Sequence, residues 1–208
     1  MLHAHSTLGE RRMSPLQVFK ADVAATASAL NPNQWAEVSA DVREMRWPAG
    51  ASIYGQHRIG DRWLFVAEGV VASEQSHADG SHSIARFFER GQVCANLTST
   101  WKRDYASDDL IAITDVAGVE LPDEFFRTNY LHGGPVGEYL RCKVIETLCF
   151  DKEIMVAKTV GSTEVRYRLL ENSYTSVIAH ARKKDIASFL GITPQGLSRF
   201  LRNRSSAA

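Results

Sequence analysis

The sequence predicts an α+β protein in which helices flank an antiparallel β domain and a long helix leads to a helical C-terminal domain. Three observations support this fold class. Short apolar runs separated by glycines fill residues 47–122, apolar residues recur at helical spacing over residues 136–160, and two short helical patterns flank a turn within residues 184–201. With 208 residues, the chain fits one large domain or two small ones.

The composition is that of a globular protein, with 44% hydrophobic and 23% charged residues. No run reaches the roughly 18 apolar residues that a membrane helix needs, and residues 1–13 lack the apolar segment of a signal peptide. Cys94, Cys142 and Cys149 are odd in number and show no CxxC spacing, which disfavours a disulfide framework and a cysteine zinc site. We therefore expect a cytoplasmic protein in a reducing compartment.

The net charge is zero, but it is unevenly distributed along the chain. Residues 161–208 carry eight Lys or Arg and three acidic residues, a net charge of +5, so the first 160 residues carry −5. A basic end on an acidic body is often found where that end contacts a polyanion such as nucleic acid. The alternative is a basic helix that is merely solvated.

Helices are expected before the β region. Ser14-Pro15 and Asn31-Pro32 each resemble a helix N-cap followed by proline at the first helical position. Trp35, Val38 and Val42 then lie on one face of the second helix. The strands that follow are expected at residues 63–66, 70–71 and 110–113, and the β region is expected to end near residues 121–123. The glycines between strands favour a sandwich or barrel: Gly50, Gly55, Gly60, Gly69, Gly80 and Gly91.

A long amphipathic helix is predicted from about Pro135 to Val160. Its apolar residues recur every four positions at Val136, Leu140, Val144 and Leu148. Further apolar residues widen this surface, which suggests more than one packing partner: Ile145, Cys149, Ile154 and Met155. The helix either covers its own β domain or pairs with its copy in a dimer.

Residues 184–201 have the pattern of a helix-turn-helix. Ile186 and Leu190 give the first helix an apolar stripe, and the small side chain of Ala187 lets a second helix cross closely. Gly191 can adopt the left-handed conformation that ends the first helix. A helical hairpin whose polar face contacts only water is the alternative interpretation.

The second helix of this motif has a cap and an inward apolar face. Thr193 can cap it, Pro194 suits its first position, and Leu197 turns inward with Phe200 and Leu201. Outward residues at the start of a recognition helix meet base edges in the major groove: Gln195, Gly196, Ser198 and Arg199. Phosphate contacts are expected from the flanking residues: Arg182, Lys183, Lys184, Thr193, Arg202 and Arg204.

The sequence resembles the Crp/Fnr family of bacterial transcription regulators. Members join a cyclic-nucleotide-binding-like β-roll, a long dimerisation helix and a C-terminal helix-turn-helix. The matching stretches lie at residues 47–50, 61–69, 79–80, 87–91 and 186–199, of which the last is the most specific. The resemblance implies a β-roll sensor domain at 14–134, a dimerisation helix at 135–160 and a DNA-binding domain at 161–208.

The family's usual base-reading pattern is Glu, two residues, Ser, Arg. This chain has Gln195, Ser198 and Arg199 at these positions. Arginine can bind guanine through two hydrogen bonds, whereas glutamine favours adenine. The operator should therefore be pseudo-palindromic but different from the family's usual one.

The cassette that holds a cyclic nucleotide in family members is degenerate here. Those members have Gly-Glu-Leu and, ten residues after the Glu, an Arg followed by Ser or Thr. This chain has Ala-Asn-Leu at 95–97 and Ala-Ser at 106–107, so both charged anchors are missing, and a nearby Arg is shifted by three residues. We expect no control by cyclic AMP or cyclic GMP, and an effector pocket lined by Ala95, Asn96, Leu97, Arg103, Ala106 and Ser107.

Other candidate sites are weaker. His77 and His82 flank the turn at Gly80 without a third ligand, so no metal is predicted. Cys142 and Cys149 are expected to be buried packing residues, with a redox sensor as the alternative. No nucleophile–base motif, P-loop or HExxH sequence is present, so we predict neither an enzyme nor a cofactor.

Together these features predict a sequence-specific, homodimeric transcription regulator in the cytoplasm. Its expected partners are double-stranded DNA and a second copy of the chain, with RNA polymerase as a further candidate and no membrane. Its effector is unknown. The alternative is a cyclic-nucleotide-domain-like signalling or interaction module that does not bind DNA.

Overall fold

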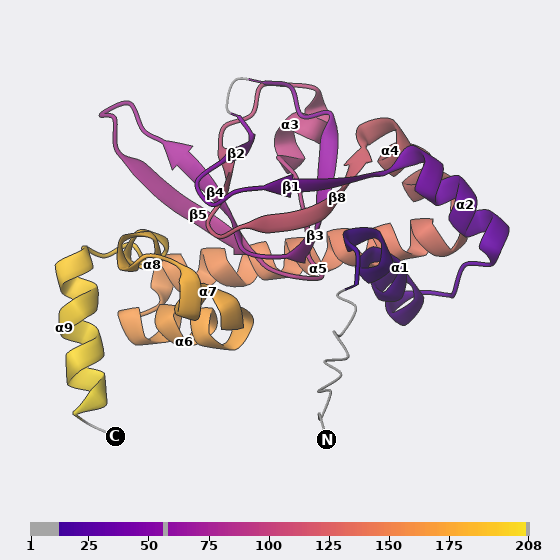
Figure 1. Cartoon of the computed structure of the whole chain (residues 1–208). Helices are drawn as coiled ribbons and strands as arrows, with labels where there is room; N and C mark the ends of the chain where they lie inside the picture. The colour runs from indigo at the N-terminus through magenta and orange to yellow at the C-terminus, as the bar shows by residue number, and fades with distance from the viewer. Residues whose placement is uncertain (1–12, 56–57, 207–208) are drawn as a thin grey trace, which may run out of the picture.

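The computed structural model describes residues 13–55 and 58–206 and shows an α+β fold, with two antiparallel sheets lying over one long helix (Figure 1). The sheets have four strands each, in the orders β1-β8-β3-β6 and β2-β7-β4-β5. The strands are β1 Arg43–Trp47, β2 Ser52–Tyr54, β3 Arg62–Glu68, β4 Val71–Ser76, β5 His82–Phe88, β6 Val93–Cys94, β7 Asp109–Ala112 and β8 Val116–Pro122. The fold class that the sequence predicts is confirmed.

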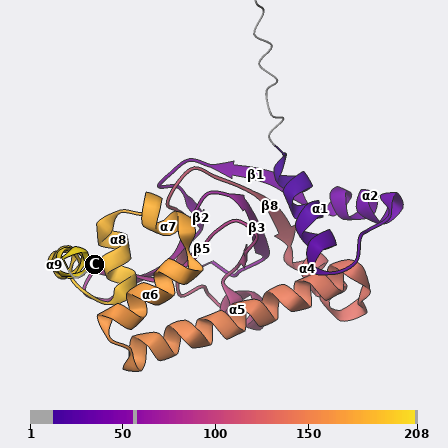
Figure 2. The same ribbon diagram turned by 90° about the horizontal axis from the view of Figure 1, so that it is seen from below.

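Helices precede, interrupt and follow the sheets. They are α1 Pro15–Thr26, α2 Pro32–Asp41, α3 Leu97–Lys102, α4 Asp123–His132, α5 Gly134–Val160, α6 Thr163–Ser173, α7 Thr175–His180, α8 Lys183–Leu190 and α9 Pro194–Ser205. Figures 1 and 2 show α5 running beneath the sheets, with α1, α2 and α4 near its N-terminal end and α6 to α9 near its C-terminal end. Among the described residues, no helix is long and apolar enough to cross a membrane.

The first two helices begin at the predicted caps. Ser14 and Gln17 exchange hydrogen bonds between side chain and backbone N–H, and Asn31 and Gln34 do the same. Such a capping box satisfies N–H groups that have no acceptor within the helix. Local sequence therefore determines where α1 and α2 start.

A hydrophobic core fills the space between the two sheets. Leu64 and Val66 of β3 pack there with Val71 of β4 and Leu110 of β7. Cys94 of β6 is fully buried in the same core, and this burial raises the pKa of its thiol to about 12. Such a thiol has little thiolate character and is unreactive.

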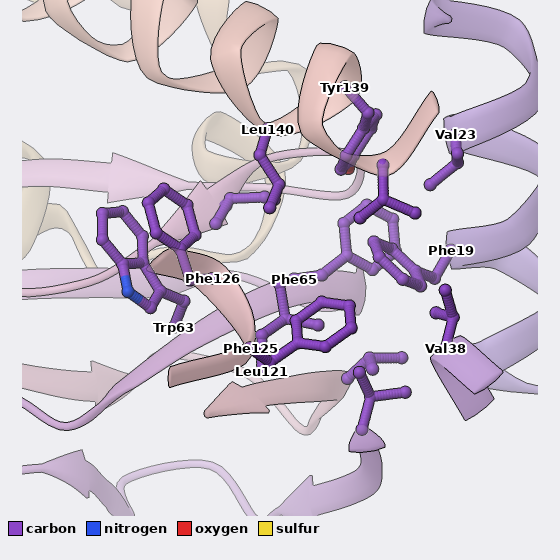
Figure 3. Packing of buried hydrophobic residues seen from close by; sticks show 14 of the residues in the cluster. Phe19, Val23, Val38, Trp63, Phe65, Leu121, Phe125, Phe126, Tyr139 and Leu140 are labelled. Atoms are coloured by element: carbon purple, nitrogen blue, oxygen red, sulfur yellow. The ribbon is translucent and has the colours of Figure 1, made fainter. Parts of the chain in front are cut away.

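A second core joins the helices to the outer face of the sheet that contains β3 (Figure 3). The Phe19 ring of α1 lies 5.1 Å from the Phe65 ring and 5.6 Å from the Tyr139 ring of α5, measured between centroids. The Trp63 ring of β3 stacks on Phe126 of α4 at 3.6 Å. Because both faces of β3 are covered, its burial is nearly continuous, which is why its sequence reads as an apolar run.

A third core joins the C-terminal helices to β4 and β5. The Phe87 ring of β5 lies 5.4 Å from the Phe189 ring of α8 and 5.9 Å from the Tyr174 ring. The Tyr174 ring also lies 5.3 Å from the Phe150 ring of α5. The β sheets and the helix-turn-helix therefore share one hydrophobic core.

The long helix is α5, and its apolar repeat is only partly buried. Val136 and Leu140 are buried and Val144 is half-buried, but Leu148 is 55% exposed. A repeat of four drifts around a helix of 3.6 residues per turn, so the stripe rotates away from the sheets. The expectation that Cys149 is buried is wrong for the same reason, since it lies on the exposed side of α5.

Candidate nucleic-acid interface and effector cavity

The turn between α8 and α9 has the geometry that its glycine predicts. Gly191 has φ 66° and ψ 37°, in the left-handed region where a side chain is disfavoured. The Gly191 N–H donates to the Ser188 carbonyl and the Ile192 N–H donates to the Ala187 carbonyl, both at 3.0 Å. These bonds satisfy the last carbonyls of α8 and set the angle at which α9 leaves.

The start of α9 is capped and its inner face is anchored. The Thr193 hydroxyl oxygen accepts a hydrogen bond from the Gly196 N–H at 3.0 Å, as expected for an N-cap. Leu197 is buried against α8, and Phe200 and Leu201 pack partly against the same core. Both helices of the predicted helix-turn-helix are therefore present in the described chain.

The outward face of α9 carries the predicted base-reading residues. Gln195, Ser198, Arg199 and Arg202 follow the i, i+3, i+4, i+7 spacing of one helix face. Gln195, Arg199 and Arg202 are exposed, whereas Ser198 and the neighbouring Gly196 are half-buried. Ser198 donates its hydroxyl to the Pro194 carbonyl at 3.0 Å, which leaves its oxygen able to accept. Figure 1 shows α9 at one end of the molecule, beside α8.

Exposed basic residues lie at the start of α8. Lys183 and Lys184 occupy its first turn and are exposed. Arg182, at the N-cap, donates from Nε to Asp185 Oδ2 at 2.7 Å, and Asp185 is buried. The charge of Arg182 is therefore neutralised by Asp185. Among the described residues, Lys183 and Lys184 have no such ion pair.

Arg204 lies on the opposite side of α9 from the base-reading residues. It follows Gln195 by nine positions, which at about 100° per residue places it roughly half a turn away. Its Nη1 and Nη2 bind Glu171 Oε1 and Oε2 of α6 at 2.8 and 2.7 Å, and its guanidinium lies 4.8 Å from the Tyr167 ring. This geometry favours a structural role for Arg204 instead of the phosphate contact that the sequence suggests.

A cavity of about 730 Å³ lies between the sheets, α5 and α8. Four of the residues predicted for the effector pocket line it: Ala95, Asn96, Leu97 and Ser107. The remaining two lie elsewhere. Ala106 lines a separate cavity of about 570 Å³, and Arg103, after α3, forms an ion pair with Asp123 at 2.9 Å.

The cassette end of the large cavity contains a carboxylate. Asp108 follows Ser107 directly and accepts hydrogen bonds from the Ser73 hydroxyl and the Asn96 amide. The Asn96 amide also donates to the Asp108 carbonyl at 3.2 Å. Asp108 is not among the predicted pocket residues, although its place next to the degenerate cassette is visible in the sequence.

The middle of the cavity contains an ion pair between a buried arginine and a partly exposed aspartate. Arg86 of β5 is 7% exposed, and its Nη1 donates to Asp151 Oδ1 of α5 at 2.6 Å. Its guanidinium lies 4.6 Å from the Phe88 ring and 5.0 Å from the Phe150 ring. Arg86 is also not among the predicted pocket residues, and its signal in the sequence is a charge within an apolar strand.

The histidines of the β4–β5 hairpin are bound to neighbouring hydroxyls. His77 Nε2 lies 2.8 Å from the Ser83 hydroxyl, and His82 Nδ1 lies 3.1 Å from the Ser76 hydroxyl. His82 also lies 3.4 Å from Glu74 Oε1.

One side of α5 exposes a row of apolar side chains. This row, the α5 apolar row, consists of Ile145, Leu148, Cys149, Met155, Val156 and Val160. Ile145 is 60% exposed and Met155 is 61% exposed. Exposed apolar rows of this extent are typical of interaction surfaces.

Comparisons with solved structures agree with this architecture. No protein-family model matches the sequence, and no curated protein is significantly similar to it. Among solved structures, FixK2 from Bradyrhizobium japonicum has a TM-score of 0.67 and 20% identity, covering 80% of this chain and 85% of that one. The c-di-GMP responsive global regulator CLP from Xanthomonas campestris has a TM-score of 0.66 and 12% identity, covering 85% and 93%.

A third solved structure, a CooA mutant from Carboxydothermus hydrogenoformans, has a TM-score of 0.65 and 16% identity, covering 90% of this chain and 84% of that one. All three are Crp/Fnr regulators. The protein therefore has the Crp/Fnr fold that its sequence predicts.

Proposed function

We propose that this protein is a sequence-specific DNA-binding transcription regulator of the Crp/Fnr type. The observation that carries the proposal is the outward stripe of Gln195, Ser198 and Arg199 on a capped helix of a helix-turn-helix. Arginine can hold guanine O6 and N7, and glutamine can hold adenine N6 and N7, so this stripe has the donors and acceptors needed to read a major groove. The fold shared with Crp/Fnr regulators supports the proposal.

Affinity would come from exposed cations that flank this stripe. Lys183 and Lys184 at the start of α8 and Arg202 on α9 are exposed. Thr193 at the N-cap and Arg182 beside Asp185 can add contacts, because a hydroxyl and a guanidinium each keep further donors. Arg204 is assigned to holding α9 on α6 through Glu171.

The functional unit would be a homodimer formed through α5. A copy of this chain could cover the α5 apolar row and remove its side chains from water. A two-fold axis along this interface would present two copies of α9 to half-sites about one helical turn apart, roughly 34 Å. Such a dimer acts in the cytoplasm, where DNA and RNA polymerase are found.

Cyclic AMP and cyclic GMP would not control the protein. A cyclic phosphate needs a cation, but the cassette end of the cavity holds the Asp108 carboxylate, and Arg103 is paired with Asp123. Placing a phosphate against a carboxylate is repulsive, and desolvating an unpaired phosphate costs several kcal/mol. The cassette therefore favours a different effector or none.

The proposal is tested by measuring binding to duplex DNA over a range of salt concentrations. A regulator should bind with an apparent affinity that falls steeply as salt rises, because each phosphate contact releases counterions. The variant K183Q/K184Q should show a smaller slope, by about one for each lysine that contacts a phosphate. Absence of any DNA binding at low salt would instead support a signalling or interaction module.

A further inference from the structure

Two cations at the α8 end of the large cavity lack a counter-charge. Lys158 of α5 and Arg166 of α6 both line the cavity there. Lys158 Nζ donates to the Ile84 and Ala85 carbonyls at 3.3 and 3.1 Å, and Arg166 Nη1 donates to the Leu190 carbonyl at 2.5 Å. Within residues 13–55 and 58–206, neither has a carboxylate within ion-pair distance, and Arg166 Nε is buried without a partner.

This end of the cavity has an unused donor that an anion could accept from, because Arg166 Nε is buried without a partner, whereas the Lys158 side chain is exposed. Lys158 Nζ also lies 4.7 Å from the centre of the Phe189 ring, in partly apolar surroundings. Burial and the nearby Arg166 lower the pKa of Lys158 to about 8. Two neighbouring cations repel each other, and an anionic group between them would offset that repulsion and accept from Arg166 Nε.

The cavity is elongated along α5. The residues of α5 that line it run from Lys143 to Thr159, which at 1.5 Å per residue spans about 24 Å. A volume of about 730 Å³ along that length can accommodate an extended chain. Apolar side chains beside the Arg86–Asp151 pair also line the cavity, and they include Phe88, Val144 and Ile154.

The charges along the cavity would orient a ligand. The cassette end holds the Asp108 carboxylate, which repels an anion. In the middle, Arg86 is neutralised by Asp151. Lys143 pairs with Asp22 at 3.1 Å and with Glu146 at 3.4 Å. Among the described residues that line the cavity, unpaired positive charge therefore remains where the cavity meets α8.

We propose that this cavity binds an elongated amphiphilic carboxylate, with its head group between Lys158 and Arg166 and its apolar chain along α5. The Ser188 hydroxyl oxygen accepts from the Ile84 N–H at 2.9 Å, so its hydrogen remains available for the head group. The head group would thereby join α5 and α6 to α8. The ligand would thereby regulate how the helix-turn-helix is held against β5. This regulatory role rests on the proposed DNA-binding function.

The test is calorimetric titration of the full-length protein with dodecanoate, without DNA. Dodecanol serves as a neutral comparison, and inorganic phosphate as an anion without a chain. We expect saturable binding of one dodecanoate per chain and much weaker binding of the other two probes. K158M and R166M should each weaken dodecanoate binding about tenfold or more, because each removes a charge-assisted hydrogen bond.

Two matched controls remove exposed charges outside the cavity. K152M on α5 and R168M on α6 should bind dodecanoate as the unmodified protein does. Circular dichroism checks that each variant is folded. If R166M does not fold, the result for K158M alone tests the site. Loss of binding in K158M with retention in K152M supports the site.

Three results would overturn the proposal: no saturable dodecanoate binding, equal binding by K158M and the unmodified protein, or phosphate binding as tightly as dodecanoate. DNA binding is measured separately on ligand-free protein. Failure of the ligand site therefore remains distinguishable from failure of the DNA-binding function.

Discussion

The exposed side chains of α8 and α9 separate into two chemical roles. Arg199 and Gln195 have the donors and acceptors that distinguish one base pair from another, and both are exposed. Lys183 and Lys184 are flexible point charges, which suit phosphates but do not distinguish bases. Sequence discrimination and salt-dependent affinity should therefore be lost through different substitutions.

Replacing Arg199 by alanine should reduce sequence discrimination. The loss on the preferred site should be about 1–3 kcal/mol, with a far smaller loss on random DNA. Fluorescence anisotropy with both duplexes at one salt concentration measures this difference. R168A, which removes an exposed arginine of α6 that pairs with Glu164, is the control. Equal losses on the two duplexes would refute base reading by Arg199.

Lys158 should make stability depend on pH. Its pKa is about 8 in the folded protein, below the ordinary lysine value of 10.5, so the unfolded chain binds more protons between these values. This group's contribution to the free energy of unfolding therefore rises with pH from about 8 to about 10.5. Denaturant titrations should show this rise in the unmodified protein relative to K158M. If the free energy of unfolding changed with pH in the same way in both proteins, the lowered pKa of Lys158 would be contradicted.

At the scale of elements, the structure follows the sequence most closely where signals are local. Ser14 and Asn31 cap their own helices, and Gly191 with Thr193 forms the α8–α9 turn through neighbouring atoms. The short strands β2 and β6 and the helix α7 lack comparable signals. Their positions depend on pairing and packing with distant segments, which no local window contains.

The candidate sites also differ in how far they depend on local sequence. The helix-turn-helix lies in one continuous segment, so its outward residues can be read from helical spacing alone. The large cavity combines β5, the segment after α3, α5, α6 and α8. Arg86, Asp108, Lys158 and Arg166 meet there only because the chain folds, and residue spacing could not bring them together.

The α5 apolar row gives a prediction for assembly. Leu148→Asp should convert a dimer to a monomer without unfolding it, because Leu148 is exposed within one chain. Burying a leucine contributes about 1.5–3 kcal/mol, and a two-fold interface would lose it from both copies. Analytical ultracentrifugation compares L148D with R168Q, a change of an exposed residue on α6. A monomeric unmodified protein at micromolar concentration would contradict this interface.

At the scale of the molecule, the β4–β5 side of the sheets and the helices α6 to α9 form one connected structure. Phe87 of β5 contacts Phe189 and Tyr174, and the Glu89 carboxylate accepts from the Ser176 and Val177 N–H groups at 2.7 Å each. Packed interfaces of this kind transmit small displacements because they do not deform continuously. A ligand in the cavity beneath β5 would therefore act directly on the orientation of α8 and α9.

The cassette gives a whole-protein prediction about nucleotides. Calorimetry of the unmodified protein with cyclic AMP and with cyclic GMP should show no saturable binding at low micromolar concentration. The reason is that Asp108 occupies the cassette end and Arg103 is paired with Asp123. Tight binding of either nucleotide would show that a cation rearranges to reach the phosphate.

The most direct test of the central claim is to select DNA with the full-length protein from a random duplex library and to sequence what binds. The account predicts an enriched, two-fold symmetric motif whose half-sites are about 10 base pairs apart, centre to centre. The same selection with R199A should lose enrichment at a guanine position in each half-site. A bound pool indistinguishable from the starting library would contradict sequence-specific recognition by α9.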